Sequence, residues 1–263
     1  MTLALPFTQV DAFADGPFTG NPAAVMPLEQ WLPDPVLQGI AAENNLAETA
    51  FTVKLPEGAG ADYELRWFTP MVEIALCGHA TLASGHVLID GRERIVFRTR
   101  KAGDLVVARE GEGLSLLLPN WTAQPRPLPD FAAAMGGDVV ETLWRESGYG
   151  VFVYPDEAAI RSLTPDFHGL RGMGNVLLIA TAPGTVADVV SRAFLPGGGV
   201  EEDPVTGSAH CVIAGYWARR LGRERFTAYQ ASARGGFLDV RIGEDGVMLT
   251  GTCRTIIRGE YLL

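Results

Sequence analysis

Two segments of helical length that are rich in apolar residues, 79–90 and 208–221, interrupt the alternation of hydrophobic and polar residues along the chain. Each begins just after a glycine, and its length predicts a helix rather than a strand. Residues 80–89 leave almost no polar face, so this helix should be buried on nearly all sides. Shorter helices are expected at 34–43 and 185–193, packed outside the central elements or between them.

Short runs rich in β-branched and aromatic residues surround each apolar segment and predict strands. Pairs such as Gly103-Asp104 and Asp245-Gly246 supply the turns between them. A β-sheet curled around one central helix, formed twice, accounts for this pattern and predicts an α+β fold. The predicted strands are 51–55, 95–99, 105–108 and 114–118 in the first half and 151–154, 176–180, 237–242 and 247–250 in the second.

The chain carries an internal repeat about half its length apart. Arg66-Trp67-Phe68-Thr69-Pro70 precedes Gly78-His79-Ala80, and Arg192-Ala193-Phe194-Leu195-Pro196 precedes Gly207-Ser208-Ala209. Solenoid periods are far shorter, so the repeat indicates a duplicated domain. A proline-rich stretch from 119 to 130 is the candidate linker. We therefore predict an N-terminal domain over 1–121 and a C-terminal domain over 122–263.

The overall charge limits the kinds of partner. The chain has 263 residues, 47% of them hydrophobic, with 21 basic and 31 acidic side chains and a net charge of −10. Nucleic acids and anionic membranes require a basic face, so neither is an expected partner. A small anionic metabolite remains compatible, because the N-terminus of a helix attracts anions locally.

The three cysteines, Cys77, Cys211 and Cys253, show no Cys-x-x-Cys spacing. Neither a disulfide framework nor a structural zinc site is expected from this set. The beginning of the chain lacks a basic segment typical of a signal peptide, and no apolar run approaches the roughly 18 residues of a membrane span. We expect a soluble protein in the reducing cytoplasm.

Each copy of the repeat places a glycine and a polar residue at the start of a predicted helix, where backbone N–H groups and the helix dipole favour an anion. If the two halves face each other, both helix N-termini would open on one cleft. His79 stands at the first N-terminus and could bind a carboxylate or transfer a proton. Asp203 lies four residues ahead of Gly207 and could bind a substrate amine or hydroxyl. Simple capping or packing is the alternative for both residues.

Glu48 is the candidate general acid or base. In an extended conformation it shares a face with Leu46 and Ala50 rather than with other charged side chains. Desolvation among apolar groups favours the protonated form and suits a carboxyl to proton transfer near neutral pH. An exposed glutamate on an edge strand is the alternative interpretation.

Other catalytic patterns do not fit. Ser208 and His210 are two residues apart on a helix and point to nearly opposite faces, which argues against a serine hydrolase. His-Glu-x-x-His and similar metal spacings are absent, and Gly197-Gly198-Gly199 lacks the residues of a nucleotide-binding loop. We therefore expect neither a metal nor a cofactor. Asn21 and Arg234 are further candidates for the cleft, Arg234 as a carboxylate ligand.

Seven motifs, in order and spanning nearly the whole chain, resemble the PhzF-like family of phenazine-biosynthesis isomerases. This resemblance implies a diaminopimelate-epimerase-like fold of two similar domains with the active site between them, in which the final strand can return to the first domain. The motifs are Asp11-Ala12-Phe13, Gly20-Asn21-Pro22-Ala23-Ala24-Val25, Asn45-Leu46-Ala47-Glu48-Thr49, Phe68-Thr69-Pro70, Cys77-Gly78-His79-Ala80-Thr81, Glu202-Asp203-Pro204-Val205-Thr206-Gly207-Ser208-Ala209-His210 and Arg234-Gly235-Gly236.

The resemblance also implies roles for individual residues. Glu48 matches the catalytic acid or base of the family, and the matching substrate-contacting positions are His79, Asp203, Gly78, Gly207 and Ser208. Ala80, next to His79, is a further candidate for substrate binding. The phenazine enzyme itself isomerises trans-2,3-dihydro-3-hydroxyanthranilate by moving a proton without a cofactor. Most members of the family are not phenazine enzymes, so the substrate does not carry over. Homodimers are frequent among enzymes of this kind, and we expect one here.

Two other functions compete with a one-acid isomerase. Cofactor-free epimerases of this fold use two thiols, one at each helix N-terminus, but Cys77 has Thr206 as its counterpart and Cys211 lies a turn inside the second helix. A two-base racemase that uses Cys77 stays open as an alternative. So does a protein that only binds a small metabolite, which would need the anion site without the buried acid.

Overall fold

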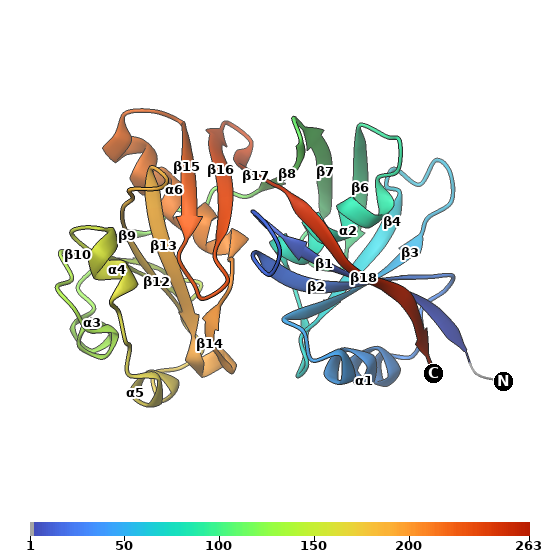
Figure 1. Ribbon diagram of the computed structural model, residues 1–263, viewed down its shortest axis with the longest axis horizontal. Helices are drawn as coiled ribbons and strands as arrows, with labels where there is room; N and C mark the ends of the chain where they lie inside the picture. The colour runs from blue at the N-terminus through green and yellow to red at the C-terminus, as the bar shows by residue number, and fades with distance from the viewer. Residues whose placement is uncertain (1–2) are drawn as a thin grey trace. The chain divides into compact units, whose positions relative to one another are not determined.

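The computed structural model describes residues 3–263, and strands dominate its mixed α+β architecture (Figure 1). The chain forms two compact units. The first extends to Leu117 and includes Thr250–Leu263, and the second is Leu118–Leu249. The last strand pairs with the first one and so belongs to the first unit.

In the first unit a sheet surrounds one long helix, α2. This helix packs against strands β1, β2, β3 and β7. The elements are β1 (Ala4–Ala12), β2 (Asn21–Leu28), α1 (Asp34–Asn44), β3 (Glu48–Lys54), β4 (Tyr63–Phe68), β5 (Glu73–Ile74), α2 (Gly78–Leu88), β6 (Arg94–Thr99), β7 (Asp104–Glu110), β8 (Gly113–Leu118) and β18 (Cys253–Leu262).

The second unit repeats this plan around the helix α6, which packs against β11 and β16. Its elements are β9 (Gln124–Pro125), α3 (Pro129–Met135), β10 (Glu141–Arg145), β11 (Tyr149–Val153), α4 (Glu157–Arg161), α5 (Phe167–Arg171), β12 (Leu177–Pro183), β13 (Val189–Leu195), the 3₁₀ turn η1 (Pro196–Gly198), β14 (Val200–Asp203), α6 (Gly207–Leu221), β15 (Arg225–Gln230), β16 (Gly236–Gly243) and β17 (Gly246–Gly251).

The strand ladders of the two units match in direction and register. Strands β1, β2, β3, β4, β6 and β7 pair in alternating antiparallel and parallel fashion, and β10, β11, β12, β13, β15 and β16 do the same. Leu65, just before Arg66, lies opposite Thr99, and Ser191, just before Arg192, lies opposite Gln230. The duplicated fold that the sequence predicts is therefore confirmed, and the α+β class with it.

One predicted element is wrong. The helix expected at 185–193 is a turn followed by the strand β13. The backbone N–H of Gly184 donates to the carbonyl of Asp188, which closes a hairpin between β12 and β13. The β-branched pair Val189 and Val190 is fully buried in this ladder, where such side chains pack well.

The helix α2 is buried as expected, whereas α6 is buried over Ala209–Ala214 and exposes Arg219 and Arg220 near its C-terminus. In α2 every residue from His79 to Gly85 is buried, and Gly85 sits directly beneath strand β7. A Cβ added at Gly85 would lie 2.5 Å from the Val107 side chain, so only glycine lets the helix and the strand approach this closely. Among the described residues, no helix combines the length and apolar character that crossing a membrane requires.

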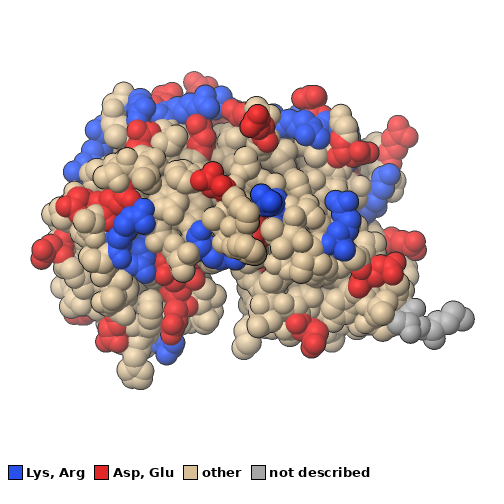
Figure 2. Space-filling model, in the orientation of Figure 1, with Lys and Arg blue, Asp and Glu red and all other residues tan. Residues whose placement is uncertain are grey.

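Acidic and basic side chains are interspersed over the face of the molecule drawn in Figure 2. Many of them form surface ion pairs, such as Arg98 with Asp104 and Arg225 with Asp239. Exposed pairs of this kind contribute little to stability. On the visible face, basic side chains lie beside acidic ones rather than forming one extended basic surface.

Candidate functional site

Three elements of the first unit bring four polar side chains together at the N-terminus of α2. Asn21 begins β2, Glu48 begins β3, and Cys77 and His79 flank the first residue of the helix. We call these four residues the α2 cluster. Gly20 adopts a φ of 76°, and a Cβ there would lie 2.5 Å from the carbonyl oxygen of Ala12. Glycine is therefore required where the chain turns into Asn21.

His79 lies between a carboxylate and a thiol. Its Nε2 atom is 3.0 Å from Oε2 of Glu48, and its Nδ1 atom is 3.5 Å from Sγ of Cys77. The side-chain nitrogen of Asn21 approaches the same Nδ1 atom at 3.3 Å. The His79 side chain is 5% exposed and that of Glu48 is 15% exposed. Glu48 is therefore the member of this ion pair that remains more open to a ligand.

The surroundings set the charges within the cluster. Burial raises the pKa of the Cys77 thiol to about 11, so the thiol is protonated at neutral pH. Burial opposes a charged imidazole, but the Glu48 carboxyl group at 3.0 Å raises the pKa of His79 well above its ordinary value of 6.5. A protonated His79 therefore faces the carboxyl group of the half-buried Glu48. The expectation that Glu48 has only apolar neighbours is wrong, because His79 comes from α2 to meet it.

The same atoms are a poor match for a metal ion. Possible ligand atoms of Glu48, Cys77 and His79 lie within 4.8 Å of one another. However, the two imidazole nitrogens face different partners, so one ion could not bind all three side chains unless the ring turned. The positive end of the α2 dipole also disfavours a cation at this place. The arrangement suits proton transfer better than metal binding.

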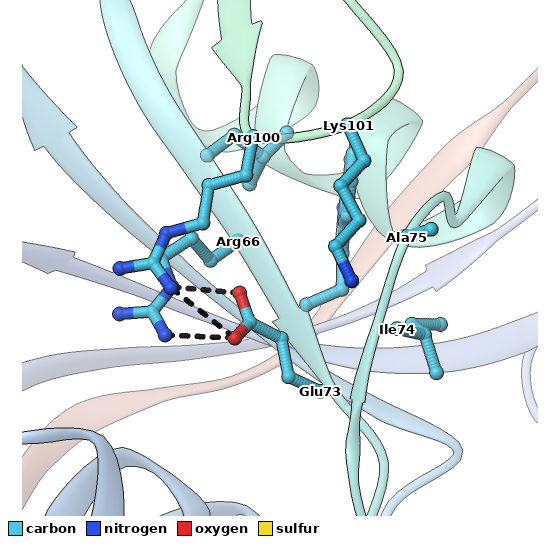
Figure 3. Close-up of a pocket in the computed structure, with 8 residues that line it drawn as sticks. Arg66, Glu73, Ile74, Ala75, Arg100 and Lys101 are labelled. Carbon is cyan, nitrogen blue, oxygen red and sulfur yellow. Dashed lines mark hydrogen bonds and ion pairs between the residues drawn. The ribbon is translucent and has the colours of Figure 1, made fainter.

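A buried arginine supports the segment that leads into α2. Arg66 donates two hydrogen bonds to the carboxylate of Glu73, at 2.8 and 2.9 Å (Figure 3). Its Nη1 atom lies 2.9 Å from Oδ1 of Asp34. Its guanidinium stacks between the rings of Trp31 and Phe68, about 5 Å from each centroid. Glu73 pairs with Phe68 across β4 and β5, so these contacts fix the chain five residues ahead of Gly78.

The second unit holds a different set of polar groups at the N-terminus of α6. The hydroxyl of Thr206 donates to the carboxylate of Asp203. Buried Gln230 accepts a hydrogen bond from the Thr206 backbone N–H at 2.8 Å and donates to the Asp203 carbonyl at 2.7 Å. We call Asp203, Thr206, Ser208, Gln230 and Tyr149 the α6 cluster. Asp203 is thus held in place by Thr206 rather than capping the helix directly.

Ser208 and His210 face different partners, which confirms that they do not form a hydrolase pair. Burial raises the pKa of the Tyr149 hydroxyl, and the neighbouring Ser208 side chain opposes this shift. His210 is fully buried, with Nδ1 2.8 Å from the Thr206 carbonyl and Nε2 3.3 Å from the Ser191 hydroxyl. Burial lowers the pKa of His210 to about 4, so this imidazole stays neutral and structural.

The loop that carries Arg234 is attached to the segment before α6. The hydroxyl of Ser232 donates to the Pro204 carbonyl at 2.7 Å and accepts from the backbone N–H of Gly235 at 3.0 Å. Gly235 has a φ of 68°, and a Cβ there would lie 2.3 Å from the Tyr229 hydroxyl. The loop is therefore fixed by its backbone, with the half-buried Arg234 at its tip.

The structure places the predicted site residues in two groups. The first group lies at the α2 N-terminus and consists of Asn21, Glu48, Gly78, His79 and Ala80. The second group lies at the α6 N-terminus and consists of Asp203, Gly207 and Ser208. Arg234 lies in the loop whose Ser232 hydrogen-bonds the Pro204 carbonyl. Sequence reasoning missed the contacts of Cys77, Gln230 and Tyr149. It also missed two glutamates, each five residues ahead of a helix glycine, although this repeated spacing could have identified them from the sequence. These are Glu73 and Glu202.

Comparisons with known proteins agree with this architecture. The family model for phenazine biosynthesis-like proteins matches residues 10–259. An uncharacterized isomerase of Pseudomonas aeruginosa is 47% identical over 99% of this chain and 100% of its own. A phenazine biosynthesis-like domain-containing protein of Homo sapiens is 34% identical over 98% of this chain and 99% of its own.

Solved structures extend the similarity to the fold. The crystal structure of a PhzF family protein from Enterococcus faecalis superposes with a TM-score of 0.92, at 43% identity, over 99% of this chain and 100% of its own. A hydroxyproline epimerase from Agrobacterium vitis shares the fold alone, with a TM-score of 0.62 at 11% identity over 99% of this chain and 93% of its own. The chain therefore belongs to the phenazine biosynthesis-like, or PhzF, family of proteins.

Proposed function

We propose that this protein is a cofactor-independent isomerase that moves a proton within a small carboxylic acid, with Glu48 as the general acid and base. The observation that carries the proposal is the 3.0 Å contact between Glu48 and His79 at the N-terminus of a buried helix. Relatives 47% and 43% identical to this chain are named as isomerases, which supports the same reaction class.

In this mechanism the Glu48 carboxylate removes a proton from a carbon next to a carbonyl or an unsaturated bond. The neighbouring His79 imidazolium stabilises the charged carboxylate before the transfer and orients it through Oε2. The same carboxyl group then returns the proton to another carbon on the same side of the substrate. A single acid that moves between two carbons needs no second base.

Backbone groups are proposed to bind the charge that the substrate carries or develops. The first N–H groups of α2, which include those of Gly78 and Ala80, have no partner within the helix, because an α-helix leaves its first four donors unused. Preorganised donors of this kind favour a carboxylate or an enolate, and the helix dipole adds to the effect. Asp203 and Ser208 are proposed to contact polar groups of the substrate, and a rise in KM in Asp203→Asn is the test of that role.

The test is solvent-deuterium exchange into a panel of small aromatic and amino carboxylic acids, followed by mass spectrometry. Wild-type protein should exchange at least one compound, and Glu48→Gln should abolish the exchange while binding persists. The matched control is Glu43→Gln, which changes an exposed glutamate on α1 and should leave exchange intact. Retained exchange in Glu48→Gln would sink the assignment, and binding without exchange in the wild type would favour a metabolite-binding protein.

A two-base racemase is the second candidate, and Cys77 beside His79 is the observation in its favour. Against it, the Cys77 thiol is protonated at neutral pH, and the equivalent position in the second unit is Thr206. Chiral analysis of the exchanged product separates the two functions. Racemisation would indicate two bases on opposite faces, whereas migration of a double bond indicates the isomerase.

A further inference from the structure

Asn21 is a buried polar member of the α2 cluster that has no role in the proposed mechanism. Its side chain is fully buried at the first position of β2, where the residue pairs with Ala12 of β1. The loop before it is fixed, because the hydroxyl of Thr19 accepts from the backbone N–H of Asp15 at 2.8 Å and donates to the carbonyl of Gly16 at 3.0 Å. A buried side chain on a fixed backbone is well placed to hold a neighbouring side chain.

The neighbour of Asn21 is the imidazole of His79. Its Nε2 atom is 3.0 Å from the Glu48 carboxyl group, so a hydrogen on Nε2 can be donated there in both the neutral and the protonated ring. The two states therefore differ at Nδ1, which accepts a hydrogen bond in the neutral ring and donates one in the protonated ring. The Asn21 amide lies 3.3 Å from this atom and the Cys77 thiol 3.5 Å. A thiol is a weak partner in either role, so the amide is the stronger one.

A primary amide can serve both states of the ring, because it carries two donor hydrogens on nitrogen and an acceptor oxygen. The Nδ2 atom of Asn21 faces the ring, as a neutral imidazole requires. A protonated ring, which the Glu48 carboxyl group favours, requires the amide oxygen in the same place. Half a turn about the last side-chain bond exchanges the two ends, and this bond has roughly twofold preferences.

We propose that Asn21 is a positioning residue that turns its amide to keep a hydrogen bond to Nδ1 of His79 in both protonation states. This contact fixes the plane of the ring, and the plane sets the direction in which Nε2 points at Glu48. The amide thus acts on the reaction through His79 and not by binding substrate. Its effect on turnover rests on the proposed role of Glu48, whereas the contact between amide and imidazole does not.

The ionisable groups around His79 leave this role to Asn21. Glu48 from the start of β3 and Cys77 from the residue ahead of α2 contact the ring. Strand β2 carries no ionisable residue. On β1, Asp11 lies on the other face of the sheet from Asn21, because the residue after it pairs with Asn21. Strands β7 and β18 meet α2 about two turns further along the helix.

Replacement of the amide tests the contact without any substrate. In heteronuclear NMR of the ring nitrogens, Asn21→Leu should lower the titration midpoint of His79 by about one pH unit, because a hydrogen bond to the charged ring is lost. Asn21→Asp should raise the midpoint by about one pH unit or more, because a nearby carboxylate favours the protonated ring. Asn44→Leu, which changes a half-buried asparagine whose amide bonds Thr49, is the matched control and should leave the midpoint unchanged.

The wild-type protein gives a test that needs no variant. The side-chain amide resonances of Asn21 should change over the same pH range as the ring nitrogens of His79, because the amide turns when the ring gains its proton. Midpoints that move in the same direction in both Asn21 variants would overturn the proposal. So would amide resonances that stay constant while the ring titrates.

Kinetics separate positioning from substrate binding. Asn21→Leu should lower kcat by about tenfold or more and leave KM nearly unchanged, because a tilted ring misplaces Glu48. A rise in KM with kcat unchanged would overturn the proposal and make Asn21 a substrate ligand. The NMR measurements do not depend on enzymatic activity, so they test the contact even where the proposed isomerase reaction fails.

Discussion

The N-terminal turns of α2 and α6 hold equivalent positions in two units with the same strand ladder, yet their side chains differ in kind. Arg66 with Glu73 and Arg192 with Glu202 are both bidentate pairs, and each glutamate stands five residues ahead of a helix glycine. These contacts fix the entry to each helix. Both units therefore have the same arginine–glutamate pair ahead of the central helix.

The two units differ in the polar side chains at the N-terminus of the central helix. Thr49 pairs with Phe68 and Leu178 pairs with Phe194, so the position equivalent to Glu48 in the second unit is Leu177. His79 corresponds to Ser208. Glu48 thus pairs with an imidazole at one helix N-terminus, whereas at the other the Asp203 carboxylate accepts a hydrogen bond from the Thr206 hydroxyl. In the proposed mechanism one unit supplies the side chains for proton transfer, while both units have backbone N–H groups that can bind an anion.

The largest expected effect distinguishes the two helix N-termini. His79→Gln removes the charged partner of Glu48 and should lower kcat by about 100-fold or more, within the usual range for acid and base groups. Ser208→Ala removes one neutral hydroxyl group and should lower kcat/KM by about tenfold or less. Steady-state kinetics on any exchanged carboxylic acid checks both. Equal losses would contradict the assignment of proton transfer to the α2 cluster.

The next prediction compares the two supporting arginines. Arg66 is 2% exposed and contacts two carboxylates, whereas Arg192 is 13% exposed and contacts one carboxylate. We expect Arg66→Met to cost about 3 kcal/mol of unfolding free energy and Arg192→Met about 2 kcal/mol, because the more buried guanidinium of Arg66 loses charge-assisted contacts with two carboxylates, each worth about 1.5–3 kcal/mol, although Arg100 stays beside both. Urea denaturation of both variants measures the order, and a larger loss at Arg192 would reverse the comparison.

The two buried histidines should respond to pH in opposite directions. The raised pKa of His79 means that its stabilising contribution is complete below pH 6.5 and is lost as the pH rises through the raised value. The pKa of His210 is lowered from 6.5 to about 4, so its folded state binds fewer protons, and stability falls by up to about 3 kcal/mol as the pH drops from 6.5 to 4.

Urea denaturation at several pH values checks these signs. His210→Gln should flatten the loss of stability on the acid side, and His79→Gln should flatten the loss above pH 6.5. Proton NMR of the two imidazole rings gives an independent measure, because each ring should titrate on its own side of pH 6.5. Titration of both rings on the same side would show that their surroundings do not differ as described.

The smallest expected effect concerns the residues that precede the helix glycines. Cys77→Ser and Thr206→Ser should each change kcat by less than about tenfold, because neither residue transfers the proton and serine retains a hydrogen-bonding group. Product formation with each variant is the measurement. Complete loss in Cys77→Ser alone would replace the one-acid mechanism with a two-base racemase.

The sequence by itself determined the duplicated fold and most of its elements. The apolar runs after Gly78 and Gly207 predicted both central helices, since only a buried helix lacks a polar face over that length. The prediction of a helix at 185–193 was wrong, because this segment forms the turn and second strand of the hairpin between β12 and β13. Tertiary pairing overrode the local preference there, as it commonly does for β-branched residues.

Part of the candidate site could also be predicted from the sequence, and part depended on the tertiary structure. Local sequence placed His79 and Ser208 at helix N-termini, because a glycine before an apolar run marks the start of each helix. Only the tertiary structure decided that Glu48 meets His79, that Cys77 and Asn21 reach the same imidazole nitrogen, and that Gln230 holds Thr206. These contacts join residues from separate strands and helices, and such distances depend on how the elements pack rather than on residue spacing along the chain.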